Sequence, residues 1–419
     1  MTDTSAINDA DAAAQPQAAA RPASLLVLVF VSVSFGLAFG IYDLLLPLYW
    51  ESRNISFTTM GYLFSIAAAV IFVMRIYVGR LSDRFGRKPF YTASLVVSGL
   101  ANLATPLLPH IVMQGVLKTS REMSALVRDT MHSILLYERD SKTFMGAVGI
   151  TRGAEFTCHG IGSLMAGAIA AAMAVTASQP NYRAPFAVSA ILVLIATVAF
   201  AFFFKPAPAD APAVPARKAA TLHELLSTDL PPKLWLLVAF GFTFEVGIWA
   251  THCFVMQLYF KGMLNNTLQL SATQMIFGLG VIFALHRLTS GIPMMLIGPR
   301  LKKNLKWLFI LFVFSEGVAL AAAPLIPNPW IALAVWLTHD LFGAGIWSPI
   351  HHHYIQKYSR PHRRGSDVSK VMALGQLGQI AGPLLASFLL AHSAPGYLGA
   401  PFIVGGIIIS LSSLILLKL

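Results

Sequence analysis

The sequence consists mainly of long apolar segments separated by short polar ones, and this alternation constrains the fold more than any other feature. Of the 419 residues, 56% are hydrophobic and 11% are charged, whereas an ordinary soluble domain has roughly 25% charged residues. The hydrocarbon core of a bilayer, ~30 Å thick, needs ~20 apolar residues for each helical crossing. Because lipid cannot satisfy backbone polar groups, we expect each apolar segment to be a transmembrane helix.

Twelve segments are long enough to cross a bilayer, six in each half of the chain. We expect helices at residues 24–48, 56–79, 89–108, 110–136, 143–176, 183–205, 233–260, 272–297, 304–325, 329–356, 367–392 and 398–418. This order predicts an all-α integral membrane protein with two pseudo-symmetric six-helix bundles. Its expected parts are a disordered cytoplasmic tail (1–22), a first bundle (23–205), a Pro- and Ala-rich cytoplasmic linker (206–232) and a second bundle (233–419).

The basic residues of the loops are divided unequally between the two expected faces of the membrane. One face has only Arg53, Arg183 and Lys261. The other has eighteen basic residues, which are Arg80, Arg84, Arg87, Lys88, Arg139, Lys142, Lys205, Arg217, Lys218, Lys233, Arg300, Lys302, Lys303, Lys306, Lys357, Arg360, Arg363 and Arg364. Since positive loops stay in the cytoplasm, we expect both termini there, in a bacterial inner membrane. This topology explains the net charge of +12 without nucleic-acid binding.

A pattern of basic and glycine residues recurs in the two halves. Arg75, Gly79, Gly86 and Lys88 are matched, each 212 positions later, by Arg287, Gly291, Gly298 and Arg300. Two six-helix repeats around a site near the membrane midplane are a known architecture of secondary transporters. The repeat therefore favours a transporter. For Arg75 and Arg287 themselves, a role in topology and a role in gating are both open.

The loop after the second segment, residues 79–88, reads GRLSDRFGRK. Gly79 permits close helix contact, Gly86 permits a tight turn, and the basic residues hold the loop at the anionic membrane surface. This loop resembles the signature loop of the major facilitator superfamily, and the chain is identified on it as a twelve-helix member.

The resemblance implies that Asp83 pairs with positive charge and a helix end of the other half, and so latches one state of the transport cycle. The latch would involve Gly79, Asp83, Arg84, Gly86, Arg87, Lys88 and Arg128. The alternative is that the basic residues only determine topology.

Ionisable residues also occur inside the expected helices, where each costs roughly 2.5–3.5 kcal/mol on insertion scales. Helical spacing places those of the fourth segment on one face, and those of the fifth segment likewise. We expect the charged faces of these two segments to line a polar cavity between the halves. Substrate binding or proton coupling would involve Asp43, Lys118, Arg121, Glu122, Arg152, Glu155, His159, Glu245, Trp249, His252 and Asp340. The alternative is a salt-bridge network that only holds helices together, with Lys118 paired to Glu122 and Arg152 to Glu155.

Two histidine patterns raise the question of a metal. The consecutive residues 351–353 are all His, but neighbours on a helix point about 100° apart and cannot share one ion. His252 and Met256 lie one turn apart and suit a soft ion such as Cu(I), yet they supply only two ligands. We therefore expect no metal site and no cofactor.

Taken together, these features predict a secondary active transporter, coupled to protons through Asp43 or Glu122. The solute would be small and anionic or zwitterionic, such as a metabolite, drug or siderophore-like carboxylate, with efflux as the expected direction. Its expected partners are the solute, protons and the bilayer, with no nucleic acid, and the chain is expected to be a monomer. The alternatives are a non-transporting scaffold or sensor on the same fold, or a copper-like metal transporter. The usual zinc, serine-nucleophile and phosphate-loop motifs do not occur in the sequence, so no enzyme activity is expected.

Overall fold

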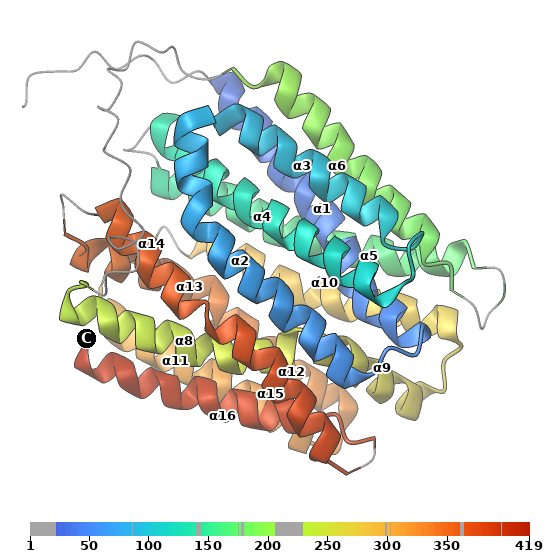
Figure 1. Ribbon diagram of the computed structural model, residues 1–419. Helices are drawn as coiled ribbons and strands as arrows, with labels where there is room; N and C mark the ends of the chain where they lie inside the picture. Colours follow the sequence, from blue (N-terminus) through green and yellow to red (C-terminus); the bar gives the residue numbers. More distant parts are fainter. Residues whose placement is uncertain are drawn as a thin grey trace, which may run out of the picture.

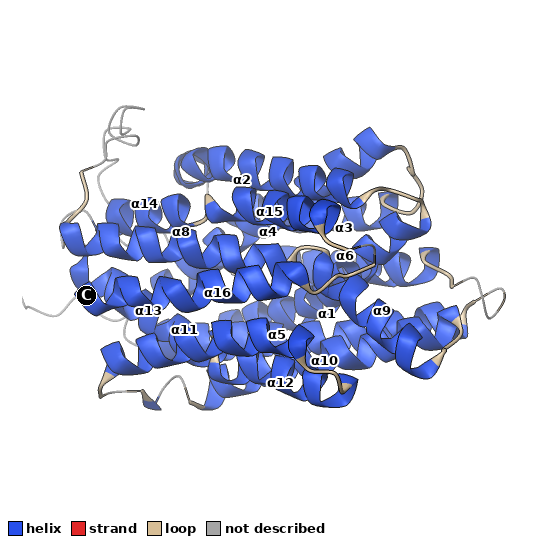
Figure 2. Cartoon of the chain, turned by 90° about the horizontal axis from the view of Figure 1, so that it is seen from below, coloured by secondary structure: helices blue, strands red, loops and turns tan. Residues whose placement is uncertain are grey.

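The computed structural model describes residues 22–85, 87–139, 144–174, 176, 180–205, 229–297, 300–301, 303–360, 364–394 and 396–419. Over these residues the elements are helices (Figure 2). Most of the expected tail, at residues 1–21, and most of the expected linker, at residues 206–228, lie outside the described residues.

Six helices make up the first half: α1 (Pro22–Ser52), α2 (Phe57–Phe85), α3 (Arg87–Ala104), α4 (Ile111–Arg139), α5 (Phe144–Ala172) and α6 (Arg183–Phe203). The second half contains α8 (Pro232–His252), α9 (Val255–Leu268), α10 (Ala272–Leu296), α11 (Leu305–Ala322), α12 (Pro329–Phe342), α13 (Ala344–Tyr358), α14 (Arg364–Gly375), α15 (Gly378–His392) and α16 (Ala400–Ile415).

Within the described residues, helices occupy each of the twelve predicted segments, but three of those predicted as continuous helices are interrupted. The crossing predicted at 233–260 consists of α8 and α9 and breaks at Cys253 and Phe254. The one at 329–356 consists of α12 and α13, and the one at 367–392 of α14 and α15. At the second break, a Cβ on Gly343 would lie 2.1 Å from the carbonyl oxygen of His339. The hydropathy of the sequence does not reveal these breaks, because the segments on both sides of each break are apolar.

Nine helical segments within the described residues are long and apolar enough to cross a membrane. The helices α3, α4 and α5 do not meet that criterion. In α4 the reason is visible in the sequence, because charged residues recur along its length. Such a helix can span a membrane only when its charged face is covered by protein.

The two halves pack against each other along two pairs of helices. Figure 1 shows α1–α6, blue to green, on one side of the molecule and α8–α16, yellow to red, on the other. Most of the contacts between them are made by α5 with α10 and by α2 with α15, and α1 adds a few with α9 and α10. The helices α3, α6, α11 and α16 pack mainly within their own half. The interior between the halves is therefore formed by α1, α2, α4, α5, α8, α10 and α15.

The two ends of the helical bundle can be told apart by the residues that lie there. Lys88, at the start of α3, donates to the carbonyl of Phe204 after α6, at 2.7 Å. Lys233, at the start of α8, donates to the carbonyl of the last residue, Leu419, at 3.1 Å. We call this end, which holds Lys88, Phe204, Lys233 and Leu419, the basic end. The opposite end is called the far end.

Helix α1 crosses α5 at a contact between glycine and backbone. A Cβ on Gly40 would lie 1.9 Å from the carbonyl oxygen of His159. Small residues permit this close approach between membrane helices. The contact brings Asp43, three residues after Gly40, against the side chain of His159.

We expect Gly40→Ala to lower the stability of the protein in detergent by about 1–3 kcal/mol, the usual cost of overpacking. The reason is that the added methyl group meets backbone of α5, which cannot rotate away. Gly149→Ala is the matched control, because a Cβ there meets no atom within 4 Å. Thermal unfolding of both variants checks the expectation, and equal unfolding temperatures would contradict the close contact.

Candidate functional site

A cavity of about 200 Å³ lies between the two halves. Its wall combines aromatic rings, charged groups and amides. Most of the lining residues belong to α1, α2 and α4 of the first half. The others belong to α8, to the break between α14 and α15, and to α15 in the second half. The lining residues are Phe39, Phe64, Ala67, Ala68, Ile71, Arg75, Lys118, Glu122, Ala125, Leu126, Asp129, Trp249, Gln376 and Gln379. Of the residues expected at the site, Lys118, Glu122 and Trp249 therefore line the cavity.

Glu122 projects from α4 between two cations. The ammonium of Lys118 is 3.5 Å from Glu122 Oε1, and a guanidinium nitrogen of Arg121 is 2.8 Å from the same oxygen. Lys118 is only 4% exposed, and its ammonium lies 3.8 Å from the ring centroid of Phe64. The guanidinium of Arg121 lies 3.8 Å from the ring centroid of Phe39. Aromatic faces attract cations, so both positive groups are held in place beside the cavity.

A second charged cluster joins α4 to α5. Arg128 is bonded to Asp129 and to Glu155, the latter at 2.5 Å. Arg152 lies 3.1 Å from Asp129 and 3.5 Å from Glu155. The guanidinium of Arg128 also covers the ring of Phe35 in α1, at 3.8 Å. Both pairs of the predicted salt-bridge network are thus present, at 118–122 and 152–155. Because Glu122 and Asp129 also line the cavity, the network forms part of its wall.

Asp43 lies where the two halves meet. Its carboxylate is 3.3 Å from Nε2 of His159 in α5 and 3.5 Å from the guanidinium of Arg287 in α10. Its backbone carbonyl accepts a hydrogen bond from the side chain of Gln257 in α9, at 3.2 Å. Arg287, which the sequence left open between topology and gating, contacts the first half. The ion pair joins α1 to α10 through the interior of the molecule.

Amide side chains of the second half meet charged groups at the basic end of the cavity. Arg75 of α2 donates to Gln376, and Gln379 donates to Glu245 at 3.1 Å. Neither glutamine stood out in the sequence, because an uncharged amide in an apolar helix gives no clear signal. Glu245, which was expected at the site, is therefore held beside the cavity by a residue that lines it.

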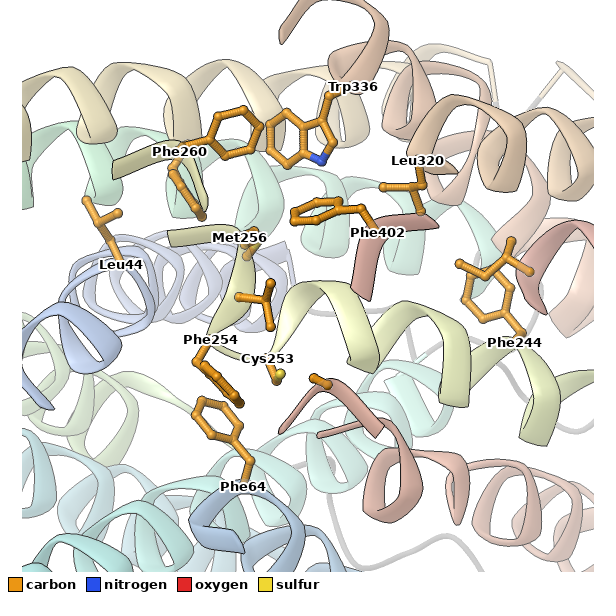
Figure 3. Close-up of a cluster of buried hydrophobic side chains, with 14 of the residues drawn as sticks. Leu44, Phe64, Phe244, Cys253, Phe254, Met256, Phe260, Leu320, Trp336 and Phe402 are labelled. Atoms are coloured by element: carbon orange, nitrogen blue, oxygen red, sulfur yellow. The ribbon is translucent and has the colours of Figure 1, made fainter. Parts of the chain in front are cut away.

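Aromatic side chains pack at the far end of the cavity, around the break between α8 and α9. Phe254, at the break, packs against Phe57 and Phe64 of α2, with ring centroids 6.4 and 5.9 Å apart. Figure 3 shows Phe254 and Phe64 facing each other. Closer to the surface, Lys261 of α9 and Glu51 of α1 form an ion pair at 2.7 Å. Around this break, aromatic side chains and an ion pair therefore connect the two halves at the far end of the molecule.

Two expected site residues, His252 and Asp340, lie in a separate cluster inside the second half. His252 is 3.1 Å from His339, and Asp340 is 2.7 Å from His286. Among the described residues that line the cavity, none belongs to this cluster.

The latch remains a prediction. The surroundings of Gly79, the side chains of Asp83 and Arg84 and the whole of Gly86 lie outside what the structure describes. Arg87 opens α3, and Lys88 is bonded to the end of α6 as described above. Arg128 belongs to the charged cluster of α4 and α5.

Comparison with known proteins gives both a sequence match and shared folds. Residues 6–127 match the family model described as Major Facilitator Superfamily. A mutant of the nucleoside transporter NupG has a TM-score of 0.74 at 11% identity, covering 94% of this chain and 99% of that one. The human organic anion transporter MFSD10 (TETRAN) has a TM-score of 0.68 at 15% identity, covering 94% and 100%.

A third structure is a bacterial homologue of the human lysosomal transporter Spinster, in an inward-facing and occupied conformation. Its TM-score is 0.65 at 14% identity, with 94% of each chain covered. No curated protein sequence matches the chain. At these identities the structures establish the fold, and their substrates remain those of the individual proteins.

The fold and the position of the cavity define the class: a multi-pass membrane protein with two six-helix bundles around a central cavity. The match over residues 6–127 and the shared fold agree with each other, and the chain has the fold of the major facilitator superfamily.

Proposed function

We propose that this chain is a proton-coupled secondary transporter that carries a small anionic or zwitterionic organic solute through the cavity between its halves. The observation that supports this most directly is the cavity itself, which has charged walls and lies at the contact between the two bundles. In transporters built from two such repeats, the halves rock around a site near the midplane. A solute bound here contacts both halves, so its binding can be linked to their movement.

The size and charge of the cavity indicate the class of solute. Its volume of about 200 Å³ is below the roughly 300–1,000 Å³ of pockets for drug-sized ligands, which favours a small metabolite. Lys118 and Arg75 present positive charge, and Glu122 and Asp129 present negative charge. Arg121 and Arg128 lie behind these carboxylates and partly neutralise them. A carboxylate of the solute can replace Glu122 beside Lys118, while an amino group can bind Asp129.

Proton coupling is assigned to Asp43, with Glu122 as the second carboxylate. When Asp43 is ionised, it attracts Arg287 across the contact between the halves. A proton on Asp43 removes that attraction and weakens the link between α1 and α10. Protonation therefore favours separation of the halves on this side, which couples the proton to the conformational change.

The remaining parts of the proposal concern placement in the membrane. We assign the basic end to the cytoplasm, since positive loops remain on that side. Bundle boundaries at 23–205 and 233–419, an inner-membrane location, a monomeric state and efflux as direction belong to the same proposal.

Transport by purified protein in lipid vesicles tests the proposal. With an imposed pH gradient, we expect uptake of small carboxylates or amino acids, and we expect organic cations to be poor competitors. Lys118→Gln should raise the KM about 10- to 100-fold, because a hydrogen bond to a charged group contributes about 1.5–3 kcal/mol. Lys303→Gln is the control, since that exposed lysine lies away from the cavity. If no solute class moves, a scaffold or sensor role replaces the transporter.

A further inference from the structure

Three histidines from separate helices converge inside the second half. They are His252 at the end of α8, His286 in α10 and His339 in α12, and one ligand nitrogen of each lies within 4.8 Å of the others. His286 and His339 are completely buried. The ring centroids lie 5.2 Å apart for His286 and His339 and 5.4 Å apart for His252 and His286. This arrangement is distinct from the cavity wall.

The hydrogen bonds of two of these rings determine which nitrogen carries the proton. Nδ1 of His252 lies 3.2 Å from the carbonyl of Ile248, which can only accept. It also lies 2.6 Å from the hydroxyl of Thr251, which itself donates to that carbonyl at 2.8 Å. Nδ1 of His339 faces the carbonyl of Trp336, which can only accept. In both neutral rings Nδ1 is therefore the donor, and Nε2 carries a lone pair.

The two lone pairs face each other. Nε2 of His252 and Nε2 of His339 are 3.1 Å apart, and two acceptors at this distance repel unless a cation lies between or beside them. In a tetrahedral site with bonds of about 2.0–2.1 Å, two ligand nitrogens lie about 3.4 Å apart. The observed separations, from 3.1 Å to the limit of 4.8 Å, bracket that value. The two nitrogens are thus spaced as a metal ion requires.

A carboxylate completes the group. Asp340 is next in sequence to His339, and its oxygens lie 2.7 Å from Nε2 of His286 and 3.6 Å from Nε2 of His339. Ser290 donates a hydrogen bond to the same carboxylate. Nδ1 of His286 has no hydrogen-bond partner among the described residues. The nearby positive charge of Arg287 opposes a cation, but its pairing with Asp43 offsets this effect.

We propose that His252, His286 and His339 bind one divalent transition-metal ion, with Zn²⁺ as the probe of choice, and that Asp340 either ligates the ion or orients His286. Three imidazoles and a carboxylate form a donor set that suits zinc. The ion ties α8, α10 and α12 together beside the break between α8 and α9. The sequence did not predict this site, because its histidines are far apart along the chain and each is isolated on its own helix.

Zinc binding to the full-length protein in detergent tests the proposal. After treatment with a chelator and equilibrium dialysis against Zn²⁺, we expect one ion per chain and an X-ray absorption spectrum with imidazole scattering. His339→Gln and His252→Gln should each weaken binding by about a hundredfold, at or beyond the 10- to 100-fold loss caused by removing groups around metal ligands. His352→Gln is the control, since that histidine is exposed on α13.

Unfolding temperatures in metal-free buffer separate loss of a ligand from loss of the fold. The half-buried His252 provides the variant that is less prone to misfold. Less than stoichiometric zinc in the folded wild-type protein would overturn the proposal. Unchanged affinity in both folded variants would overturn it as well. A proton shared between imidazoles, seen by NMR without any zinc binding, would then account for the facing nitrogens.

Discussion

Asp43→Asn is expected to abolish solute accumulation driven by a pH gradient while leaving downhill exchange of solute intact. Asparagine cannot ionise, so it imitates the protonated state and no longer attracts Arg287 at the contact between the halves. Proton and solute binding are linked by a coupling free energy, for which about 1–3 kcal/mol, or 5- to 150-fold, is typical. Without this coupling the pH gradient no longer drives the solute, so the accumulation ratio should fall to that of downhill equilibration. Uptake and counterflow in vesicles measure the two activities separately.

Glu51→Gln is the matched control for Asp43. Glu51 also forms an ion pair between the halves, with Lys261, but its side chain is 33% exposed and it lies at the far end of the molecule. Exposed ion pairs contribute about 0–1 kcal/mol, so proton-driven accumulation should continue in this variant. Full accumulation in Asp43→Asn would contradict the assignment of Asp43 and transfer the role to Glu122, for which Glu122→Gln is the corresponding test.

Arg128→Gln is expected to cause the largest loss of stability among single changes in the charged clusters. Arg128 is 1% exposed and is bonded to both Asp129 and Glu155. Removing one partner of a buried ion pair leaves an uncompensated charge and costs about 3–5 kcal/mol. Thermal unfolding in detergent, with binding of a fluorescent dye to exposed apolar surface as readout, measures this loss.

Arg152→Gln is the control for Arg128, because Arg152 contacts the same two carboxylates with a side chain that is 33% exposed. Solvent screens the pair of an exposed cation, and the expected loss is about 1 kcal/mol or less. A double change of Arg128 and Glu155 to Leu should recover part of the stability, since it leaves no unpaired charge between them. Equal losses in the two arginine variants would show that burial does not determine the strength of this cluster.

Several features of the fold and site followed from local sequence. Most of the predicted crossings follow from the length of an apolar segment, because a bilayer requires a minimum number of apolar residues, whereas α3, α4 and α5 are less apolar. The charged face of α4 could be predicted from helical spacing, and the pair of Lys118 and Glu122 has the separation that helical neighbours have. These predictions needed only one helix at a time.

Other features depended on contacts between helices and could not be predicted in that way. The pairing of Asp43 with Arg287 joins residues 244 positions apart, and no periodicity relates them. Gln376 and Gln379 could be recognised as residues of the candidate site only from the charged groups that they contact. In the sequence, His252 stands one helical turn from Met256, whereas the structure places His252 beside His339 of another helix.

The sequence by itself therefore determined the number, order and charged faces of the membrane helices, because lipid imposes the same requirement on every crossing. Only the tertiary structure decided which charged faces meet, where helices break and which side chains surround the cavity. The physical reason is that helix formation in lipid depends on groups within one segment, whereas ion pairs and histidine clusters depend on how separate segments pack.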